Sequence, residues 1–216
     1  MKVAKLIGLA ALSAFMSFAW AESASAVTLT FEGLGDNAPI GSYYDGGAGG
    51  NFGIVFGADS LALIEGSAGG SGNFSNAPSG HTIAYFLGGP GDLMDVAGGF
   101  TTGFSFFYAD QVGFTGQVDV FDGLGGTGTL LASLLLPSTP DPYNVWVPIG
   151  VAFLGTAHSV LFSGAANFIG FDNITLGSVT PGTPGAVPLP PALPLFASAI
   201  TGLGLLRWRR GRKATA

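Results

Sequence analysis

The stretch "GFSFFYADQVGFTGQVDVFDGLGGTGTLLASLLL", residues 103–136, shows the pattern from which the fold is predicted. It contains three apolar or alternating runs, 103–109, 116–122 and 129–136, separated by short segments rich in Gly and polar residues. Runs of this length with turn residues between them are typical of β-strands. No window keeps a helical period of apolar residues, so the stretch predicts consecutive strands.

Six further runs of the same kind lie on both sides of this stretch. They cover residues 27–32, 51–56, 81–87, 143–153, 158–163 and 168–176. Many short strands with such turns predict an all-β domain, a β-sandwich or jelly roll, over residues 27–178. Two Gly-rich segments, 46–53 and 66–80, are predicted to be loops.

One segment matches the sequence pattern of a phosphate-binding turn. Residues 123–128, "GLGGTG", match the glycine pattern of a dinucleotide-binding turn and follow a predicted strand. The next segment, "TLLASLLLPSTP", is too short and ends too soon at Pro137 for the helix that such a turn requires. A hairpin turn is therefore predicted here.

The two ends of the chain carry all of its Lys and Arg residues. Lys2 and Lys5 precede an apolar segment, 6–20, and Ala24 and Ala26 form a small-residue cleavage site. This order is typical of a secretory signal peptide over residues 1–26, read by the Sec machinery and signal peptidase, with a retained anchor as the alternative. The protein is therefore expected to be exported.

The C-terminal end predicts a second membrane element. A Pro- and Gly-rich linker, 179–191, precedes an apolar segment, 192–208, that is long enough for a short transmembrane helix, and a basic tail, 209–216, follows. By the positive-inside rule the tail stays in the cytoplasm. The basic side chains that resist translocation are Arg207, Arg209, Arg210, Arg212 and Lys213.

This C-terminal order resembles a known family of sorting signals. Val187, Pro188, Leu189 and Pro190, followed by the apolar segment and the Arg cluster, are similar to the VPLPA variant of PEP-CTERM proteins, with "VPLPP" in place of VPLPA. The resemblance implies a Gram-negative bacterium, an exosortase that cuts near the motif, and delivery to the cell surface or matrix after transient anchoring in the inner membrane. It also implies an association with exopolysaccharide and biofilm.

The composition of the predicted domain excludes several functions. Twelve of the thirteen Asp and Glu residues lie in residues 27–178, which contain no Lys or Arg, so nucleic acid is not an expected partner. Cysteine is absent, which excludes disulfides and CxxC zinc sites. The two histidines, His81 and His158, lie in separate runs, there is no GxSxG motif, and no carboxylate pair stands out. A non-enzymatic protein is therefore expected, with an extracellular hydrolase as the remote alternative.

A cation site is predicted between the first and last strands. Glu32, Asp36, Asp172 and Asn173 supply the carboxylate and amide oxygens that Ca²⁺ prefers. The pattern is similar to jelly-roll carbohydrate-binding modules, in which acids near the first and in the last strand hold a structural ion. Alternatively, Asp172 and Asn173 bond the local backbone at the strand end.

Aromatic residues provide a weaker indication of a binding site. The candidates for stacking on a sugar are Tyr43, Tyr44, Tyr108, Tyr143 and Trp146, because such a ring has an apolar face and a polar group. Trp146 alternates with Val145 and Val147, so packing in the core is expected for it, with contact to a ligand as the alternative. The sequence thus favours an exported structural protein of the envelope or matrix, with a carbohydrate-binding module as the alternative.

Overall fold

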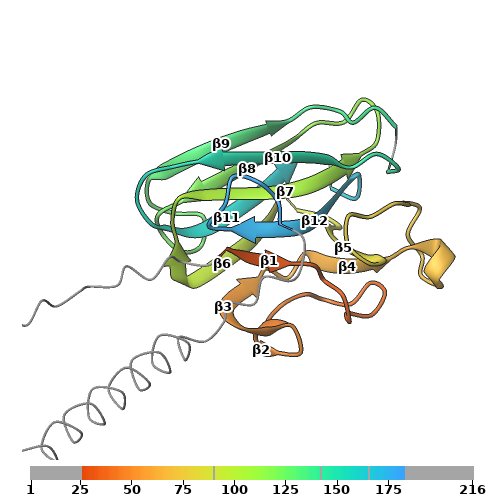
Figure 1. Cartoon of the computed structure of the whole chain (residues 1–216), viewed down its shortest axis with the longest axis horizontal. Coiled ribbons are helices and arrows are strands. Elements are labelled where there is room, and N and C mark those ends of the chain that lie inside the picture. Colours follow the sequence, from red (N-terminus) through yellow and green to blue (C-terminus); the bar gives the residue numbers. More distant parts are fainter. Residues whose placement is uncertain (1–25, 90, 142, 165, 183–216) are drawn as a thin grey trace, which may run out of the picture.

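Two antiparallel β-sheets packed face to face form the domain (Figure 1). The structure is a computed structural model that describes residues 26–182 except 90, 142 and 165. Each sheet has six strands. The predicted β-sandwich is therefore confirmed.

The first sheet, sheet A, has the strand order β10-β7-β12-β5-β4, and β1 pairs with the end of β12. Val27 and Leu29 of β1 lie opposite Leu176 and Ile174 of β12, so the predicted meeting of the first and last strands is confirmed. The strands of sheet A are β1 (Val27–Leu29), β4 (Ser60–Ile64), β5 (Thr82–Phe86), β7 (Gly103–Asp110), β10 (Val147–Ala152) and β12 (Ile169–Leu176).

The second sheet, sheet B, has the strand order β2-β3-β6-β11-β8-β9. A short 3₁₀ turn, η1 (Gly66–Ala68), lies in the connection between β4 and β5. The strands of sheet B are β2 (Tyr44–Gly47), β3 (Gly50–Phe56), β6 (Gly91–Phe100), β8 (Gly116–Phe121), β9 (Leu130–Leu136) and β11 (Ala157–Gly164).

Phenylalanine fills the space between the sheets. Phe106 and Phe171 of sheet A contact Phe162 of sheet B, with ring centroids 6.0 and 4.9 Å from the Phe162 ring and edge-to-face geometry. Phe104 also packs on Phe162. Burying such large rings supplies much of the apolar contact that holds a sandwich without disulfides together.

All nine predicted strand runs contain a strand, but their ends differ from the prediction in two places. The first strand stops at Leu29, and Phe31 has a left-handed φ of 63°, so Glu32 lies in a turn. The run 143–153 begins as a strand only at Val147, because Tyr143 also has a left-handed φ, of 57°. A left-handed φ interrupts the regular extended conformation, and in these two runs the left-handed residue lies outside the strand.

Three strands were not predicted: β2, β4 and β6. The segment 46–53 was expected to be a loop, which is wrong, because most of it forms the β2–β3 hairpin. β6 lies in the middle of sheet B although Asp92, Asp95 and a Gly pair interrupt its apolar pattern. The loop at 66–80 and the hairpin turn at 123–128 are confirmed.

The predicted signal peptide, with Ala24, and everything from residue 183 onward lie outside the described residues. This includes the sorting motif, the transmembrane segment and the basic tail, so these stay predictions. Ala26 is described and exposed. Within residues 26–182, gaps aside, the structure contains no helix with the length and hydropathy of a membrane span.

Candidate functional site

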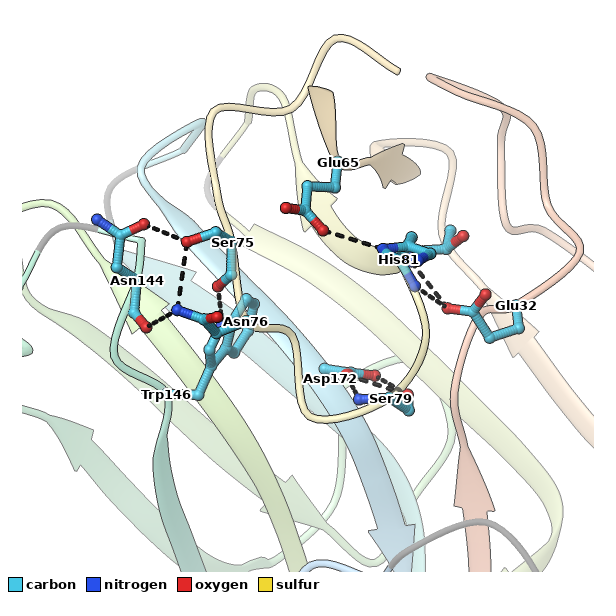
Figure 2. Close-up of polar contacts among 10 residues, drawn as sticks. Glu32, Glu65, Ser75, Asn76, Ser79, His81, Asn144, Trp146 and Asp172 are labelled. Carbon is cyan, nitrogen blue, oxygen red and sulfur yellow. Dashed lines mark hydrogen bonds and ion pairs between the residues drawn. The ribbon is translucent and has the colours of Figure 1, made fainter. Parts of the chain in front are cut away.

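The Gly-rich segment 66–80, here called the docked loop, lies against the outer face of sheet A. Ile83 and Tyr85 of β5 and Gly170 and Asp172 of β12 are on this face, because their alternate neighbours point into the core between the sheets. Figure 2 shows the docked loop held by side chains from three parts of the chain. The docked loop is therefore held in a defined position on sheet A.

Asp172 holds the C-terminal part of the docked loop. Its carboxylate accepts hydrogen bonds from the Ser79 backbone N–H at 2.8 Å, the Ser79 hydroxyl at 2.9 Å and the Asn173 N–H at 2.7 Å. The side chain is fully buried. Burial raises the pKa of Asp172 to about 7, because a charged carboxylate is poorly solvated there, although these hydrogen bonds oppose the shift.

Glu32 holds the next residues along the chain. One of its carboxylate oxygens accepts hydrogen bonds from the N–H groups of His81 at 3.0 Å and Thr82 at 2.8 Å. The carboxylate lies so close to Gly80 that a Cβ there would come within 2.2 Å of it. A glycine is therefore required at residue 80, which also has a left-handed φ of 48°.

Asp36 holds the start of the docked loop. Its carboxylate accepts hydrogen bonds from the N–H groups of Ile64 at 2.9 Å and Ser71 at 3.1 Å. The bond from Ile64 is the main reason that the pKa of Asp36 lies below its ordinary value. At the other end of the docked loop, His81 Nδ1 lies 3.0 Å from a carboxylate oxygen of Glu65, so the residues that flank the loop contact each other.

The three carboxylates predicted to bind calcium are therefore occupied with backbone N–H groups in and beside the docked loop. Asp172 binds Ser79, Glu32 binds the two residues that follow the loop, and Asp36 binds Ile64 and Ser71. Both polar atoms of the buried Asn173 amide lack a partner among the described residues. In the described part of the chain, no three Asp, Glu, His or Cys side chains form a metal-binding group. The four residues do not form one ligand set here, and the calcium site stays a prediction.

Trp146 joins the docked loop to the connection between β9 and β10. Its indole N–H donates to the Ser75 carbonyl oxygen at 3.0 Å, and the Ser75 N–H donates to the Tyr143 carbonyl oxygen at 3.1 Å. Asn144 adds two contacts, to the Ser75 hydroxyl at 2.5 Å and to the Asn76 amide at 3.4 Å (Figure 2). These bonds fix two loops, distant in sequence, against each other.

A small aromatic pocket lies between these loops and sheet A. Its walls combine the rings of Phe74, Tyr85, Tyr143 and Trp146 with the side-chain amides of Asn73 and Asn167. Phe74 and Trp146 meet edge to face, with ring centroids 6.0 Å apart. The remaining lining residues are Leu63, Ile83, Ile169 and Gly170.

Gly170 allows Trp146 to lie close to the sheet. A Cβ at Gly170 would lie 3.3 Å from Cη2 of Trp146 and 2.7 Å from Cδ1 of Ile83. Trp146 is therefore half-buried on the outer face of sheet A, and its predicted place in the core is wrong. Its alternation with two valines correctly predicted an apolar environment for the Trp146 ring, but it did not show on which side of the sheet the ring lies.

Of the aromatic residues predicted to stack on a sugar, Tyr143 and Trp146 line this pocket, whereas Tyr43, Tyr44 and Tyr108 do not. The Tyr44 hydroxyl accepts a hydrogen bond from the Phe31 N–H at 2.7 Å, and the Tyr43 hydroxyl donates to the Glu32 carbonyl oxygen at 2.7 Å. Burial raises the pKa of Tyr44. Both tyrosines thus support the turn that carries Glu32, and the sequence contained no signal that paired Phe74 or Tyr85 with Trp146.

Comparisons with known proteins find neither a matching family model nor a matching curated protein. Solved structures with some likeness include CsCBM6-3 from Clostridium stercorarium in complex with cellobiose (11% identity, 70% of this chain and 93% of that chain, TM-score 0.40). Another is the CBM22-1–CBM22-2 tandem domain from Paenibacillus barcinonensis Xyn10C (12% identity, 76% and 48%, TM-score 0.38).

A third is a family 43 arabinoxylan arabinofuranohydrolase from Bacillus subtilis in complex with cellotetraose (22% identity, 55% of this chain, TM-score 0.36). The chain spans 24% of the length of that enzyme. Identities and TM-scores this low do not indicate a shared ligand or shared site residues. The function proposed below therefore depends on the pocket itself.

Proposed function

We propose that the sandwich is a non-catalytic carbohydrate-binding domain of an exported protein, and that its aromatic pocket binds a sugar unit of a neutral polysaccharide. The observation that carries the proposal is the pocket on sheet A, which is lined by four aromatic residues and two asparagines. A pocket that is mostly apolar, with a few placed polar groups, is the usual form of a small-ligand site.

The chemistry of this lining suits a pyranose. Trp146 and Tyr143 are half-buried, so part of each ring is available to stack on the apolar face of a sugar. The amides of Asn73 and Asn167 are exposed and can both donate to and accept from sugar hydroxyls. The lining contains no Asp, Glu or His, so we assign no catalytic step to the pocket.

The charge of the domain selects against acidic polysaccharides. Residues 27–178 carry twelve acidic side chains and no Lys or Arg, so an anionic chain would approach against a repulsive field. A neutral polysaccharide meets no such repulsion. The hydrogen bonds that join Ser75 to Tyr143 and Trp146 also position the pocket before binding, which lowers the entropic cost of binding.

We propose further that the N-terminal signal peptide and the C-terminal sorting segment direct the protein to the cell surface. The signal peptide and the PEP-CTERM-like tail support this proposal from the sequence. Mass spectrometry of protein from the producing cell is expected to find a chain that starts near Val27 and ends before about residue 191. A surface-located protein that keeps "RWRRGRK", residues 207–213, would overturn the processing step.

The binding proposal can be tested by native affinity electrophoresis of the purified protein in gels that contain one polysaccharide each. The probes are neutral (hydroxyethylcellulose, mixed-linkage β-glucan, xyloglucan, arabinoxylan, galactomannan) or anionic (alginate, polygalacturonate). We expect retardation by at least one neutral polymer and by neither anionic one. The absence of retardation by every neutral probe would overturn the proposal and favour a purely structural matrix protein.

Variants assign the binding to the pocket. Trp146→Ala is expected to weaken binding about tenfold, because a stacked ring contributes on the order of 1 kcal/mol or more. Asn73→Ala changes an exposed amide and tests the pocket without disturbing the fold. The control is Phe52→Ala, an aromatic that is 46% exposed and lies outside this pocket. Equal binding by wild type, Trp146→Ala and Asn73→Ala would exclude this pocket.

A further inference from the structure

A second concavity, here called the terminal hollow, opens between the two sheets where β1 begins and β12 ends. Its cavity volume is about 380 Å³. Sheet A contributes Val27 and Leu176, and sheet B contributes Phe52, Ile54, Val96 and Phe100. The hollow is thus separate from the aromatic pocket, which lies on the outer face of sheet A.

The lining of the terminal hollow is apolar and extends from the core to the surface. Ile54, Val96 and Leu176 are at most 4% exposed, whereas Phe52 at the mouth is 46% exposed. The only side-chain hydroxyls in the lining belong to two threonines, and no carboxylate or amide is present. Such a surface suits an aliphatic chain better than a sugar, whose hydroxyls would lose their hydrogen bonds with water there.

Export would place a positive charge on this lining. Cleavage after Ala26, as the sequence predicts, would make Val27 the N-terminal residue, with an α-amino group that is largely protonated at neutral pH. Residues 27–182 contain no Lys or Arg. The α-amino group would therefore be the one full positive charge of the domain near pH 7, on a residue that lines the terminal hollow.

We propose that the terminal hollow of the processed protein binds a single-chain anionic amphiphile, such as a fatty acid. The aliphatic chain enters between the sheets, and the anionic headgroup pairs with the α-amino group of Val27 at the mouth. The twelve acidic side chains of the domain repel an anion at long range, so this pairing acts only at contact distance, where the amine also repels a cationic headgroup. The proposal depends on cleavage after Ala26 and is independent of the carbohydrate pocket.

The test measures binding by isothermal titration calorimetry, with the protein isolated from an exporting host and its N-terminus determined by mass spectrometry. The probes are sodium decanoate, sodium hexanoate and decyltrimethylammonium bromide, each below its critical micelle concentration. We expect decanoate to bind one molecule per chain, and hexanoate and the cationic amphiphile to bind at least about tenfold more weakly. Equal affinity for decanoate and the cation would overturn the proposal.

One substitution blocks the terminal hollow without crowding the fold. Gly98 lines it, has no left-handed φ, and a Cβ there would meet no atom within 4 Å, so the side chain of Gly98→Leu has room to occupy the hollow. The matched control is Gly88→Leu, since Gly88 also has open space around it and lies outside the hollow. Gly98→Leu should weaken decanoate binding about tenfold or more, and Gly88→Leu should not change it. Unchanged binding by Gly98→Leu would overturn the assignment.

Amine acetylation tests the headgroup. Residues 27–191, the chain expected after both ends are removed, contain no Lys, so an amine-reactive acetyl ester modifies the α-amino group of that chain. We expect decanoate affinity to fall about two- to fivefold, the loss typical of one exposed ion pair. Unchanged affinity after acetylation, or equal affinity in protein that retains its leader, would overturn the pairing with Val27.

Discussion

The outer faces of the two sheets differ in what covers them. In sheet A every residue of β12 and β5 is buried. In sheet B, by contrast, β8 alternates regularly between buried and more exposed residues, and Leu135 of β9 is 67% exposed. Sheet B therefore has the solvated outer face that is common in antiparallel sheets, whereas the central strands of sheet A are covered on both faces.

Three segments cover sheet A. The docked loop lies over β5 and β12, residues 143–146 lie beside it, and the chain after β12 turns back over Gly103 and Gly150, where Val179 leaves no room for a Cβ. A second layer over a sheet creates the walls of a pocket, and it also buries polar groups that must then find partners. The docked loop therefore does two things: it supplies part of the wall of the candidate binding pocket, and it supplies the hydrogen-bond donors for the buried carboxylate of Asp172.

The largest expected effect is a loss of stability that distinguishes the covered outer face of sheet A from the solvated outer face of sheet B. Asp172→Ala on sheet A leaves two N–H groups and one hydroxyl without their acceptor, each costing about 1–3 kcal/mol, so we expect the free energy of unfolding to fall by about 3–5 kcal/mol. The measurement is denaturant unfolding of the purified protein. The matched control is Asp119→Ala on the outer face of sheet B, where the carboxylate accepts only from Gln117 and the expected loss is below about 0.5 kcal/mol.

The same two variants also test the predicted calcium site when unfolding is repeated with calcium and with a chelator. If Asp172 acts by holding the docked loop, its loss costs the same stability under both conditions. A loss that appears only with calcium would show that the carboxylate acts through an ion. Equal, small losses for Asp172→Ala and Asp119→Ala would contradict the structural role of Asp172.

The next effect concerns a buried acid between the sheets. Asp92 of β6 is 6% exposed, its only side-chain partner is the Ser60 hydroxyl of β4, and one of its oxygens has no partner among the described residues. Burial raises the pKa of Asp92 to about 7, above its ordinary value of 3.8. The folded state therefore holds a proton that the unfolded state releases above about pH 4.

This sign means that stability decreases as pH rises. The stabilisation from the protonated acid is complete below about pH 4 and is lost progressively as pH rises to about 7, so we expect Asp92 by itself to make the protein roughly 2–3 kcal/mol less stable at pH 8 than at pH 5. Asp172, also raised to about 7, acts in the same direction. Thermal unfolding across this range checks the result, and Asp92→Asn should reduce the slope. A melting temperature that rises with pH would contradict both shifts.

The smallest expected effect tests the contact between sheet A and its cover. Gly170→Ala places a methyl group against Ile83 and Trp146, so we expect a loss of about 1–2 kcal/mol and weaker polysaccharide binding as Trp146 shifts. Gly88→Ala, in open space, is the control. The melting temperature measures the loss of stability, and affinity electrophoresis measures the change in polysaccharide binding. Weaker stability with unchanged binding would separate the packing of Trp146 from ligand recognition.

The sequence predicted the elements whose signal is local. Alternating and apolar runs located nine of the strands, and Gly-rich turns located the docked loop and the β8–β9 hairpin. β6 was missed because Asp92 and Asp95 interrupt its pattern, yet only Asp92 faces the core, where burial and the Ser60 hydroxyl stabilise its protonated form. A residue type indicates the average preference of a side chain for water, and a buried acid departs from that average.

By itself the sequence determined an acidic, cysteine-free β-sandwich, because hydrophobic alternation and turn chemistry act over a few residues. Only the tertiary structure decided which face of sheet A is covered and which groups meet there. Asp172 and Ser79 are 93 residues apart, and Trp146 and Ser75 are 71 apart, so no local pattern pairs them. Alternation separates the two sides of a strand, but the partners on each side depend on how distant loops fold back over the sheet.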